Sequence, residues 1–410
     1  MSIQSSPVAV LFTHELGIIN FADAQFGKGC AVLLDHTGEM PDSIHLRLGE
    51  TSPGGYSSGY FLPLIWKTGN IPNDVLSAFP ADTEQDCALL FLDSSQGHYH
   101  AACVISHLSR KFLVNVKIVE TGAHTFTRNK AILESDILRH KVALCIGLGS
   151  GGAPVVNDLV RSGVGKFILW DNDRIEAHNV GRHICGIEDI GRLKTHVLRD
   201  RILSINPQAI VNTVEEDVLD QSGIGKLLYE AVATADVVIA ATDNNPSRFA
   251  INEAAWGLRK PALYGRAFTR ACGGDVIQVV PSQQTPCYAC HIQERVVDEE
   301  ISSQRDADAI AYADRPVPIE PGLHVDITPI SNMISRLALA HLAIGTGSSL
   351  ELIADELNAP LYLWGNRREH NFAQWEPMQR TFSKMSILRW YGITIPANKH
   401  CCVCGKASID

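Results

Sequence analysis

The sequence predicts an α/β protein in which a Rossmann-like, mostly parallel sheet with a zinc clip is preceded by a smaller α/β domain. Three observations support this fold class. From Lys141 onward, apolar segments of strand length alternate with helical segments, as in a parallel sheet covered on both faces. A glycine-rich turn joins the first of these strands directly to a helix, and two C-x-x-C pairs occur later in the chain.

Composition limits the classes of function. The 410 residues are enough for two or three domains, each with its own core. The formal net charge of −10 argues against a nucleic-acid partner, because binding a polyanion needs clustered Lys and Arg. The first residues lack the features of a secretory signal, so we expect a cytoplasmic protein. No membrane partner is expected, because the most apolar later stretch contains Arg336 and His341 and is too short to span a bilayer.

Residues 1–120 are expected to form the smaller domain, whose role the sequence does not indicate. Within it, residues 87–119 predict strand, helix and strand, because helical periodicity in HAACVISHLSRKF separates an apolar run from an alternating segment. A boundary is expected near residues 120–124. The segment TFTRNKAILESDILRH then predicts a charged helix that leads into the second domain, 125–410.

The second domain alternates strands and helices. Its predicted strands are VALCI, KFILWD, ADVVIAAT, PALYG and DVIQVV. Ligands of such sheets bind at the carboxyl ends of the strands. An irregular acidic stretch over 291–325 predicts a crossover loop, followed by an apolar helix from about Asp326 to Ala343.

The turn after the first strand carries Gly147, Gly149 and Gly152 in the spacing G-x-G-x-x-G. Glycine lets backbone amides approach a phosphate at the positive end of a helix. Asp171 and Asp173 follow the second strand, where a carboxylate can bind ribose hydroxyls. Taken alone, these residues fit a nicotinamide-dependent oxidoreductase, or a glycine turn that binds no ligand.

Later motifs separate these interpretations, because they add two cations and a carboxylate that hydride transfer does not need. They contain, in order, Asn179, Arg182, Lys194, Asp243 and Asn244. With the glycine turn, the ordered motifs N-x-x-R, G-x-x-K and T-D-N resemble the ThiF/MoeB and ubiquitin-activating enzyme superfamily over about residues 125–405. His183 stands where that superfamily usually has glutamine.

The resemblance implies ATP-dependent adenylylation of the C-terminal carboxylate of a ubiquitin-like protein for conjugation to a target, with a conjugating enzyme as a further partner. Cations lower the barrier when a carboxylate attacks the α-phosphate and pyrophosphate leaves. The implied roles are phosphate contact for Arg182 and Lys194, Mg²⁺ binding for Asp243, ribose binding for Asp171 or Asp173, and further ATP contacts for Asn179 and Asn244. One alternative stays open, adenylylation of a sulfur-carrier protein or peptide without conjugation, and a nicotinamide-dependent oxidoreductase is more distant. A non-catalytic scaffold would be expected to have lost several of these residues, and none is lost.

The superfamily also implies an arginine from the helix before the first Rossmann strand, often supplied across a dimer interface. TFTRNKAIL matches that helix and places Arg128 in this role. A homodimer is therefore expected. The alternative is a helix residue paired with a nearby acid.

Two C-x-x-C pairs predict a structural zinc site. The chain has 11 cysteines, and four of them, Cys287, Cys290, Cys401 and Cys404, have the spacing of a tetrahedral Cys₄ site. Such a site would tie the C-terminal segment 399–405 back to the sheet, and free thiols are the alternative. The same pairing recurs in the superfamily.

The acceptor of an activated acyl group is left open. No cysteine occurs between Cys290 and Cys401, so a thiol nucleophile in the crossover loop is excluded. Ser302 and Ser303 lie in that loop, although serine is a weak nucleophile without a base beside it. Cys185 follows Arg182 closely, but an apolar wall beside the nucleotide explains it equally well.

Overall fold

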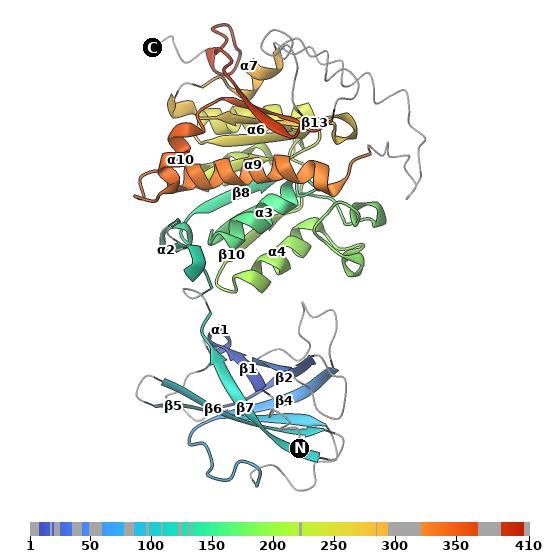
Figure 1. Ribbon diagram of the computed structural model, residues 1–410, viewed down its shortest axis with the longest axis vertical. Coiled ribbons are helices and arrows are strands. Elements are labelled where there is room, and N and C mark those ends of the chain that lie inside the picture. Colours follow the sequence, from blue (N-terminus) through green and yellow to red (C-terminus); the bar gives the residue numbers. More distant parts are fainter. Residues whose placement is uncertain are drawn as a thin grey trace. The chain divides into compact units, whose positions relative to one another are not determined.

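The computed structural model of the protein describes most of the chain (Figure 1). The described residues are 8–16, 19, 25–34, 43–48, 60–77, 86–95, 98–107, 110–121, 125–129, 132–133, 135–220, 224–283, 285–293, 321–367 and 387–405. The chain divides into two compact units, Met1–Thr125 and Phe126–Asp410. Each unit has its own hydrophobic core.

The described part of the N-terminal unit is one closed sheet with the strand order β1-β3-β2-β4-β5-β6-β7. The sheet closes through parallel pairing of β1 with β7. Alternate residues point inward and form a core that includes Leu11, Leu46, Leu64 and Leu90, all at most 1% exposed. The elements are β1 (Val8–Phe12), α1 (Thr13–Leu16), β2 (Phe26–Leu34), β3 (Ser43–Leu48), β4 (Tyr60–Thr68), β5 (Cys87–Ser95), β6 (His98–His107) and β7 (Arg110–Val119).

The prediction of a helix in this unit was wrong. HAACVISHLSRKF forms most of β6 and the start of β7, so the smaller domain, expected to be α/β, consists in its described part of strands and the four-residue helix α1. The cause is that β6 buries apolar side chains on both faces. Cys103 and Ile105 face the inner core, whereas Val104 packs outside with Val75 and Phe91. Burial on both faces removes the two-residue alternation by which a strand is recognised.

The C-terminal unit is built on an eight-stranded sheet with the order β10-β9-β8-β11-β12-β13-β14-β15. The first five strands in this order are parallel and the last three are added antiparallel. The chain runs outward from β8 to β10 and then returns to the other side of β8, so a topological switch point lies between β8 and β11. The strands are β8 (Val142–Ile146), β9 (Lys166–Trp170), β10 (Ile210–Val214), β11 (Val237–Ala240), β12 (Ala262–Ala267), β13 (Gly273–Val279), β14 (Leu361–Gly365) and β15 (Arg389–Ile393).

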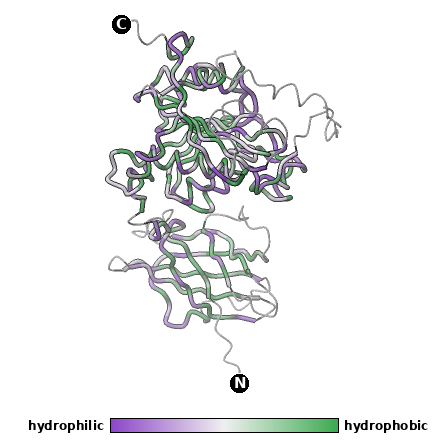
Figure 2. Tube along the Cα trace, turned by 45° about the horizontal axis from the view of Figure 1, so that its top comes forward, coloured by the Kyte–Doolittle hydropathy of each residue, from purple (hydrophilic) through white to green (hydrophobic). Residues whose placement is uncertain are grey.

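Helices cover both faces of this sheet, as the alternating pattern predicted. One face packs against α3 (Gly152–Arg161), α4 (Lys194–Ile205), α9 (His324–Ala343) and α10 (Leu350–Glu356). In Figure 1, α3 lies between α4 and α9. The other face packs against α5 (Ile224–Thr234), α6 (Asn245–Gly257) and α7 (Tyr288–Gln293). Figure 2 shows hydrophobic residues concentrated along the strands between these layers.

The single charged helix predicted before β8 is replaced by two short pieces, η1 (Thr127–Asn129) and α2 (Ser135–Leu138). Leu133 and Leu138 are buried against the core of the second unit, so tertiary packing overrides the local helical pattern. The other short helices among the described residues are η2 (Ala177–Asn179), η3 (Ile187–Asp189), η4 (Thr269–Ala271) and η5 (Pro281–Gln283).

Within the described part of the chain, no helix is both long enough and apolar enough to cross a membrane.

Candidate functional site

The glycine turn between β8 and α3 lies at the switch point. Gly147 has a positive φ of 85°, and a Cβ atom there would lie 2.6 Å from the carbonyl carbon of Ala241, just after β11. A Cβ atom on Gly152 would lie 2.0 Å from the Gly147 carbonyl oxygen. A Cβ atom on Gly149 would meet nothing within 4 Å. Gly147 and Gly152 therefore let the turn pack tightly, and Gly149 leaves open space at the N-terminus of α3, where a phosphate can bind.

The two aspartates after β9 have different environments. The Asp171 carboxylate accepts hydrogen bonds from the Leu148 and Asp173 backbone N–H groups, at 2.7 and 2.9 Å. Its side chain is 8% exposed, and burial raises its pKa while nearby Lys194 opposes that shift. The Asp173 side chain is 67% exposed. Asp171 thus supports the glycine turn, and Asp173 is the more exposed of the two carboxylates.

Lys194 lies beside both carboxylates. Its Nζ atom is 2.7 Å from Asp173 and 3.7 Å from Asp171, and its side chain is only 10% exposed. Lys194 is the first residue of α4, and its backbone N–H donates to the Asp173 carbonyl at 3.1 Å. The structure therefore brings the predicted phosphate-binding lysine to the glycine turn on a rigid element.

Asn179 and Arg182 belong to one short loop. The Asn179 side-chain oxygen accepts from the Glu176 N–H at 2.9 Å, and the Arg182 N–H donates to the Asn179 carbonyl at 2.9 Å. Arg182 is half-buried. The following residue, His183, contacts the Leu148 carbonyl at 2.7 Å, which attaches this loop to the glycine turn.

Asp243 and Asn244 follow β11, next to the glycine turn. Asp243 is exposed, so its carboxylate is accessible to a metal ion. Asn244 caps α6, because its side-chain oxygen accepts from the Ser247 N–H at 2.9 Å, while its amide nitrogen donates to Asp243 at 3.2 Å. The side-chain oxygen of Asn244, a predicted ATP contact, is thus occupied by the helix cap. The amide nitrogen of Asn244 orients the neighbouring Asp243.

Arg128 is not brought to the other predicted residues of its own chain. The adjacent Asn129 donates to the carbonyl of Arg161 at 3.3 Å, and Arg161 ends the helix that Gly152 begins. A helix of this length spans about 15 Å. Arg128 therefore lies near the end of α3 that is remote from the glycine turn, and it is exposed.

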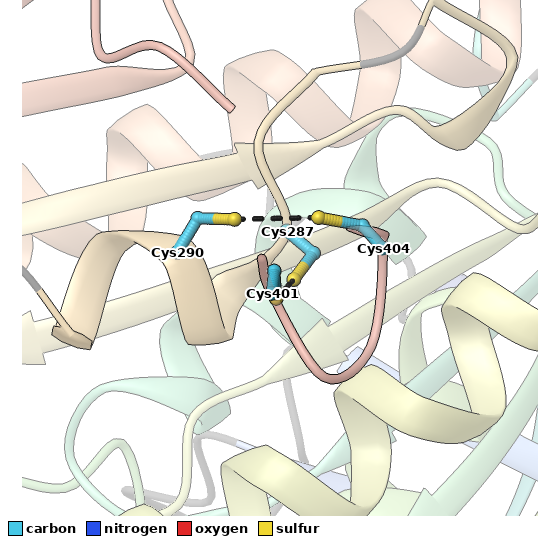
Figure 3. Close-up of side chains that lie close together, drawn as sticks. All are labelled: Cys287, Cys290, Cys401 and Cys404. Carbon is cyan, nitrogen blue, oxygen red and sulfur yellow. Dashed lines mark hydrogen bonds between the residues drawn. The ribbon is translucent and has the colours of Figure 1, made fainter. Parts of the chain in front are cut away.

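Four cysteines converge as the sequence predicted (Figure 3). The sulfur atoms of Cys287, Cys290, Cys401 and Cys404 all lie within 4.8 Å of one another. Tetrahedral zinc–thiolate bonds place sulfur atoms about 3.8 Å apart. Two of the pairs are 3.5 and 3.3 Å apart, and three of the four residues are at most 2% exposed. The donor set and its burial fit a closed structural zinc site.

The thiols of the cluster differ in acidity, because burial raises the pKa values of Cys287 and Cys404 whereas the pKa of Cys401 is lowered. Burial raises the Cys401 pKa too, but hydrogen bonds from backbone amides and from the Cys287 and Cys290 thiols outweigh burial and lower that pKa to about 7. A thiolate is the form that binds zinc. The cluster joins α7 to the chain end beyond β15.

Of the three suggested acyl acceptors, Cys185 is among the described residues and the two serines are not. Ser302, Ser303 and most of the crossover loop lie outside the described residues. Cys185 is 9% exposed and packs with Ile175 and Val197. Burial and nearby Asp189 raise the pKa of its thiol. Its surroundings therefore favour the apolar-wall interpretation over a reactive thiol.

Two contributors to the site were missed from sequence. Arg248 of α6 is 7% exposed and donates to the Thr242 carbonyl, beside Asp243. His324, the first residue of α9, bonds to the Arg182 carbonyl at 3.0 Å. The sequence offers one signal for Arg248: it is a charged residue four positions after the helix cap Asn244, on the face of the helix that packs against the sheet. His324 carries none, because its partner is 142 residues away.

The chain is similar in sequence to a known protein family. The pattern of the ThiF family matches residues 128–372. The sulfur carrier protein ThiS adenylyltransferase of Escherichia coli K12 is 36% identical over 148 residues, covering 36% of this chain and 56% of that protein. Ubiquitin-like modifier-activating enzyme 5 of Arabidopsis thaliana is 25% identical over 156 residues, covering 35% and 36%. The crystal structure of E. coli MccB with MccA-N7isoASN has a TM-score of 0.47 at 18% identity, covering 66% and 69%.

The chain spans about half or less of the length of these two curated relatives. The family pattern covers more than half of the chain, including the glycine turn, the three charged motifs and the first cysteine pair. This chain belongs to the ThiF family.

Proposed function

We propose that the protein uses ATP to adenylylate the C-terminal carboxylate of a ubiquitin-like protein for conjugation to a target. The observation that carries the proposal is the position of Lys194, a cation held beside Asp171 and Asp173 next to a glycine turn at a helix N-terminus. A dinucleotide-binding site for hydride transfer uses an acidic residue on the ribose of NAD, or an arginine on the 2′-phosphate of NADP, and does not need a lysine paired with two carboxylates.

The reaction assigns a task to each group. A carboxylate oxygen of the protein substrate attacks the α-phosphorus of ATP, forming an acyl–phosphate bond while pyrophosphate leaves with the electrons of the broken bond. Amides at the N-terminus of α3 and the side chains of Arg182 and Lys194 counter the negative charge of the phosphates. Asp243 would hold Mg²⁺, which would supply positive charge to the phosphates. Asp173 would bind the ribose, and Asn179 would keep the Arg182 loop in place.

The relatives support two versions of the substrate. Names of the matched proteins include adenylyltransferases for sulfur carriers and activating enzymes for ubiquitin-like modifiers. The alternative to conjugation is therefore adenylylation of a sulfur carrier or a peptide with no later transfer to a target. The more distant alternative is a nicotinamide-dependent oxidoreductase.

ATP–pyrophosphate exchange tests the proposal. The purified protein is incubated with ATP, labelled pyrophosphate and, one at a time, the small glycine-ending proteins encoded in the same genome. We expect exchange that depends on one of them. Exchange with none of them, together with reduction of NAD⁺ or NADP⁺ by an added alcohol or hydroxy acid, would favour the oxidoreductase.

Arg128 is proposed to act across a homodimer, because it lies at the end of α3 remote from its own glycine turn. We expect Arg128→Ala to lower exchange by about 10³-fold, the lower end of the effect of an arginine supplied in trans. Mixing Arg128→Ala with Asp243→Ala and allowing subunit exchange should restore activity, because one site of the heterodimer is complete. Mixtures that exchange subunits and stay inactive would place the arginine within its own subunit or in a structural role.

No thioester is expected in the crossover loop, because the sequence has no cysteine between Cys290 and Cys401. Any covalent acyl-enzyme there is predicted to be an oxyester on Ser302 or Ser303. Denaturing gels of enzyme, ATP and substrate should show a shifted band that survives thiol reductant, yields to hydroxide and vanishes in the double serine-to-alanine variant. A reductant-sensitive band that is lost in Cys185→Ala would move the acceptor to the nucleotide site and refute this prediction.

A further inference from the structure

Both ring nitrogens of His183 are engaged in hydrogen bonds inside the protein. The side chain is 7% exposed, Nε2 lies 2.7 Å from the Leu148 carbonyl oxygen, and Nδ1 lies 3.2 Å from the Cys185 backbone nitrogen. An amide N–H can only donate, so Nδ1 must be the unprotonated acceptor and Nε2 must donate to the carbonyl. The contacts thus fix the ring in one neutral tautomer.

The two partners of His183 belong to different segments of the nucleotide site. Leu148 lies within the glycine turn, and its own N–H is held by Asp171 at 2.7 Å. Cys185 lies three residues after Arg182, in the loop that begins at Asn179. The imidazole therefore joins the turn that would cradle a phosphate to the loop that carries a cation.

A second histidine, His324, also contacts this loop. His324 donates from Nδ1 to the Arg182 carbonyl at 3.0 Å, and the Arg182 N–H donates to the Asn179 carbonyl at 2.9 Å. The backbone of Arg182 is thus fixed at its N–H and its carbonyl, and the next residue is fixed to the turn. Because the Arg182 backbone is held at these points, the position from which its guanidinium side chain extends is fixed relative to the glycine turn.

We propose that His183 is a positioning residue for nucleotide binding, which sets the Arg182 loop against the glycine turn so that both face the same phosphates. This inference rests on the proposed function. A merely space-filling side chain at this position would need no polar atoms, whereas His183 supplies one donor and one acceptor to two backbone groups. If the His183 ring were replaced by an apolar side chain, the buried Leu148 carbonyl and Cys185 N–H would lose these hydrogen-bond partners.

The test compares variants that differ in hydrogen bonding at similar volume. His183→Gln supplies an amide N–H donor and a carbonyl acceptor, whereas His183→Met fills space and supplies neither. His196→Ala is the control, since His196 is a surface histidine of α4 whose side chain is 41% exposed. For each protein, the dissociation constant of ATP is measured by calorimetry, kcat and KM for ATP by exchange, and the folded fraction by thermal melting.

We expect His183→Met to stay folded and to raise both the ATP dissociation constant and KM about tenfold, the loss that one or two hydrogen bonds produce. His183→Gln should return both constants to within about threefold of wild type, and His196→Ala should match wild type. Wild-type ATP affinity in a folded His183→Met protein would overturn the proposal. So would a His183→Gln protein that is as impaired as His183→Met.

The pH dependence of ATP affinity is a further test, because a His183 side chain with a purely structural role would not alter it. Burial lowers the pKa of His183 below its ordinary value of about 6.5, so the neutral ring persists at neutral pH and is lost as the pH falls through the lowered pKa. Protonated Nδ1 can no longer accept from Cys185. Lys194 and His324 oppose this protonation, and Asp189 favours it. These three residues, and the Asp171 carboxylate that binds Leu148, are unchanged between wild type and His183→Gln.

The ratio of His183→Gln to wild-type ATP affinity should therefore rise as the solution is acidified below about pH 6.5. A ratio that stays constant down to the pH of unfolding would contradict the positioning role. The binding measurements also separate the two hypotheses. If wild type binds ATP but catalyses no exchange, the proposed function fails while the variants still decide the role of His183.

Discussion

Exchange activity should fall by on the order of a thousandfold in Asp243→Ala, an effect as large as that expected from the loss of Arg128. Asp243 follows β11 beside the glycine turn, and its carboxylate is the group assigned to Mg²⁺. Removing it leaves the phosphate charge uncompensated during attack on the α-phosphorus. Because Asp243 is exposed and packs into no core cluster, the folded state should lose little stability. The measurement is substrate-dependent ATP–pyrophosphate exchange, with thermal melting as the check on folding.

Two further variants belong to the same test. Arg182→Ala and Lys194→Ala should each abolish exchange, because each removes a phosphate-binding cation. Lys194→Ala also leaves the buried Asp171 without its nearby cation, so some loss of stability is expected in that variant alone. Glu253→Ala is the matched control, since Glu253 is an exposed acid on α6. Full exchange by a folded Asp243→Ala protein would refute the assigned role.

Removing the metal should have the largest effect on stability. Elemental analysis of protein purified without chelator should give one zinc per chain, bound with a free energy on the order of 10 kcal/mol that is coupled to folding of the site. Replacing Cys401 and Cys404 by serine, or treating with a strong chelator, should release the chain beyond β15 from α7. Proteolysis of this segment should accelerate before ATP binding is affected, because the cysteines and the glycine turn lie on different elements.

Cys402 supplies the control for the zinc prediction. It lies between the two ligands of the second pair, is exposed and is not part of the cluster. Cys402→Ser should keep the zinc and the protease resistance of wild type. Protein that carries no zinc, or that loses zinc equally in Cys402→Ser, would show that the four thiols serve another purpose.

The second domain was predictable because its signals are local. The apolar run VALCI became β8, and KFILWD became β9 with Asp171 just beyond it, and the glycine turn joins β8 to α3 as its spacing indicated. The helix expected from about Asp326 to Ala343 is α9, which begins two residues earlier. The cysteine spacing was equally informative, since C-x-x-C pairs bring two thiols together on one short turn.

The errors arise where contacts between distant residues decide the structure. Val104 and Ile105 are both buried, on opposite faces of β6, and this hid the strand from a periodicity argument. The sequence left the ribose ligand open between Asp171 and Asp173, and it did not predict that the Asp171 carboxylate accepts from the Leu148 and Asp173 amides, because only the folded turn brings these groups near. The contacts of His183 and His324 with Leu148 and Arg182 could not be predicted for the same reason.

The proposal that the protein adenylylates a carboxylate is tested most directly by following oxygen from substrate to nucleotide. The C-terminal carboxylate of the protein substrate that supports exchange is labelled with heavy oxygen, and the acyl-adenylate is then cleaved by a thiol. The attacking carboxylate oxygen becomes the bridge to the α-phosphorus, so the released AMP should carry one heavy oxygen atom. Unlabelled AMP, or ADP and phosphate in place of AMP and pyrophosphate, would contradict attack on the α-phosphorus.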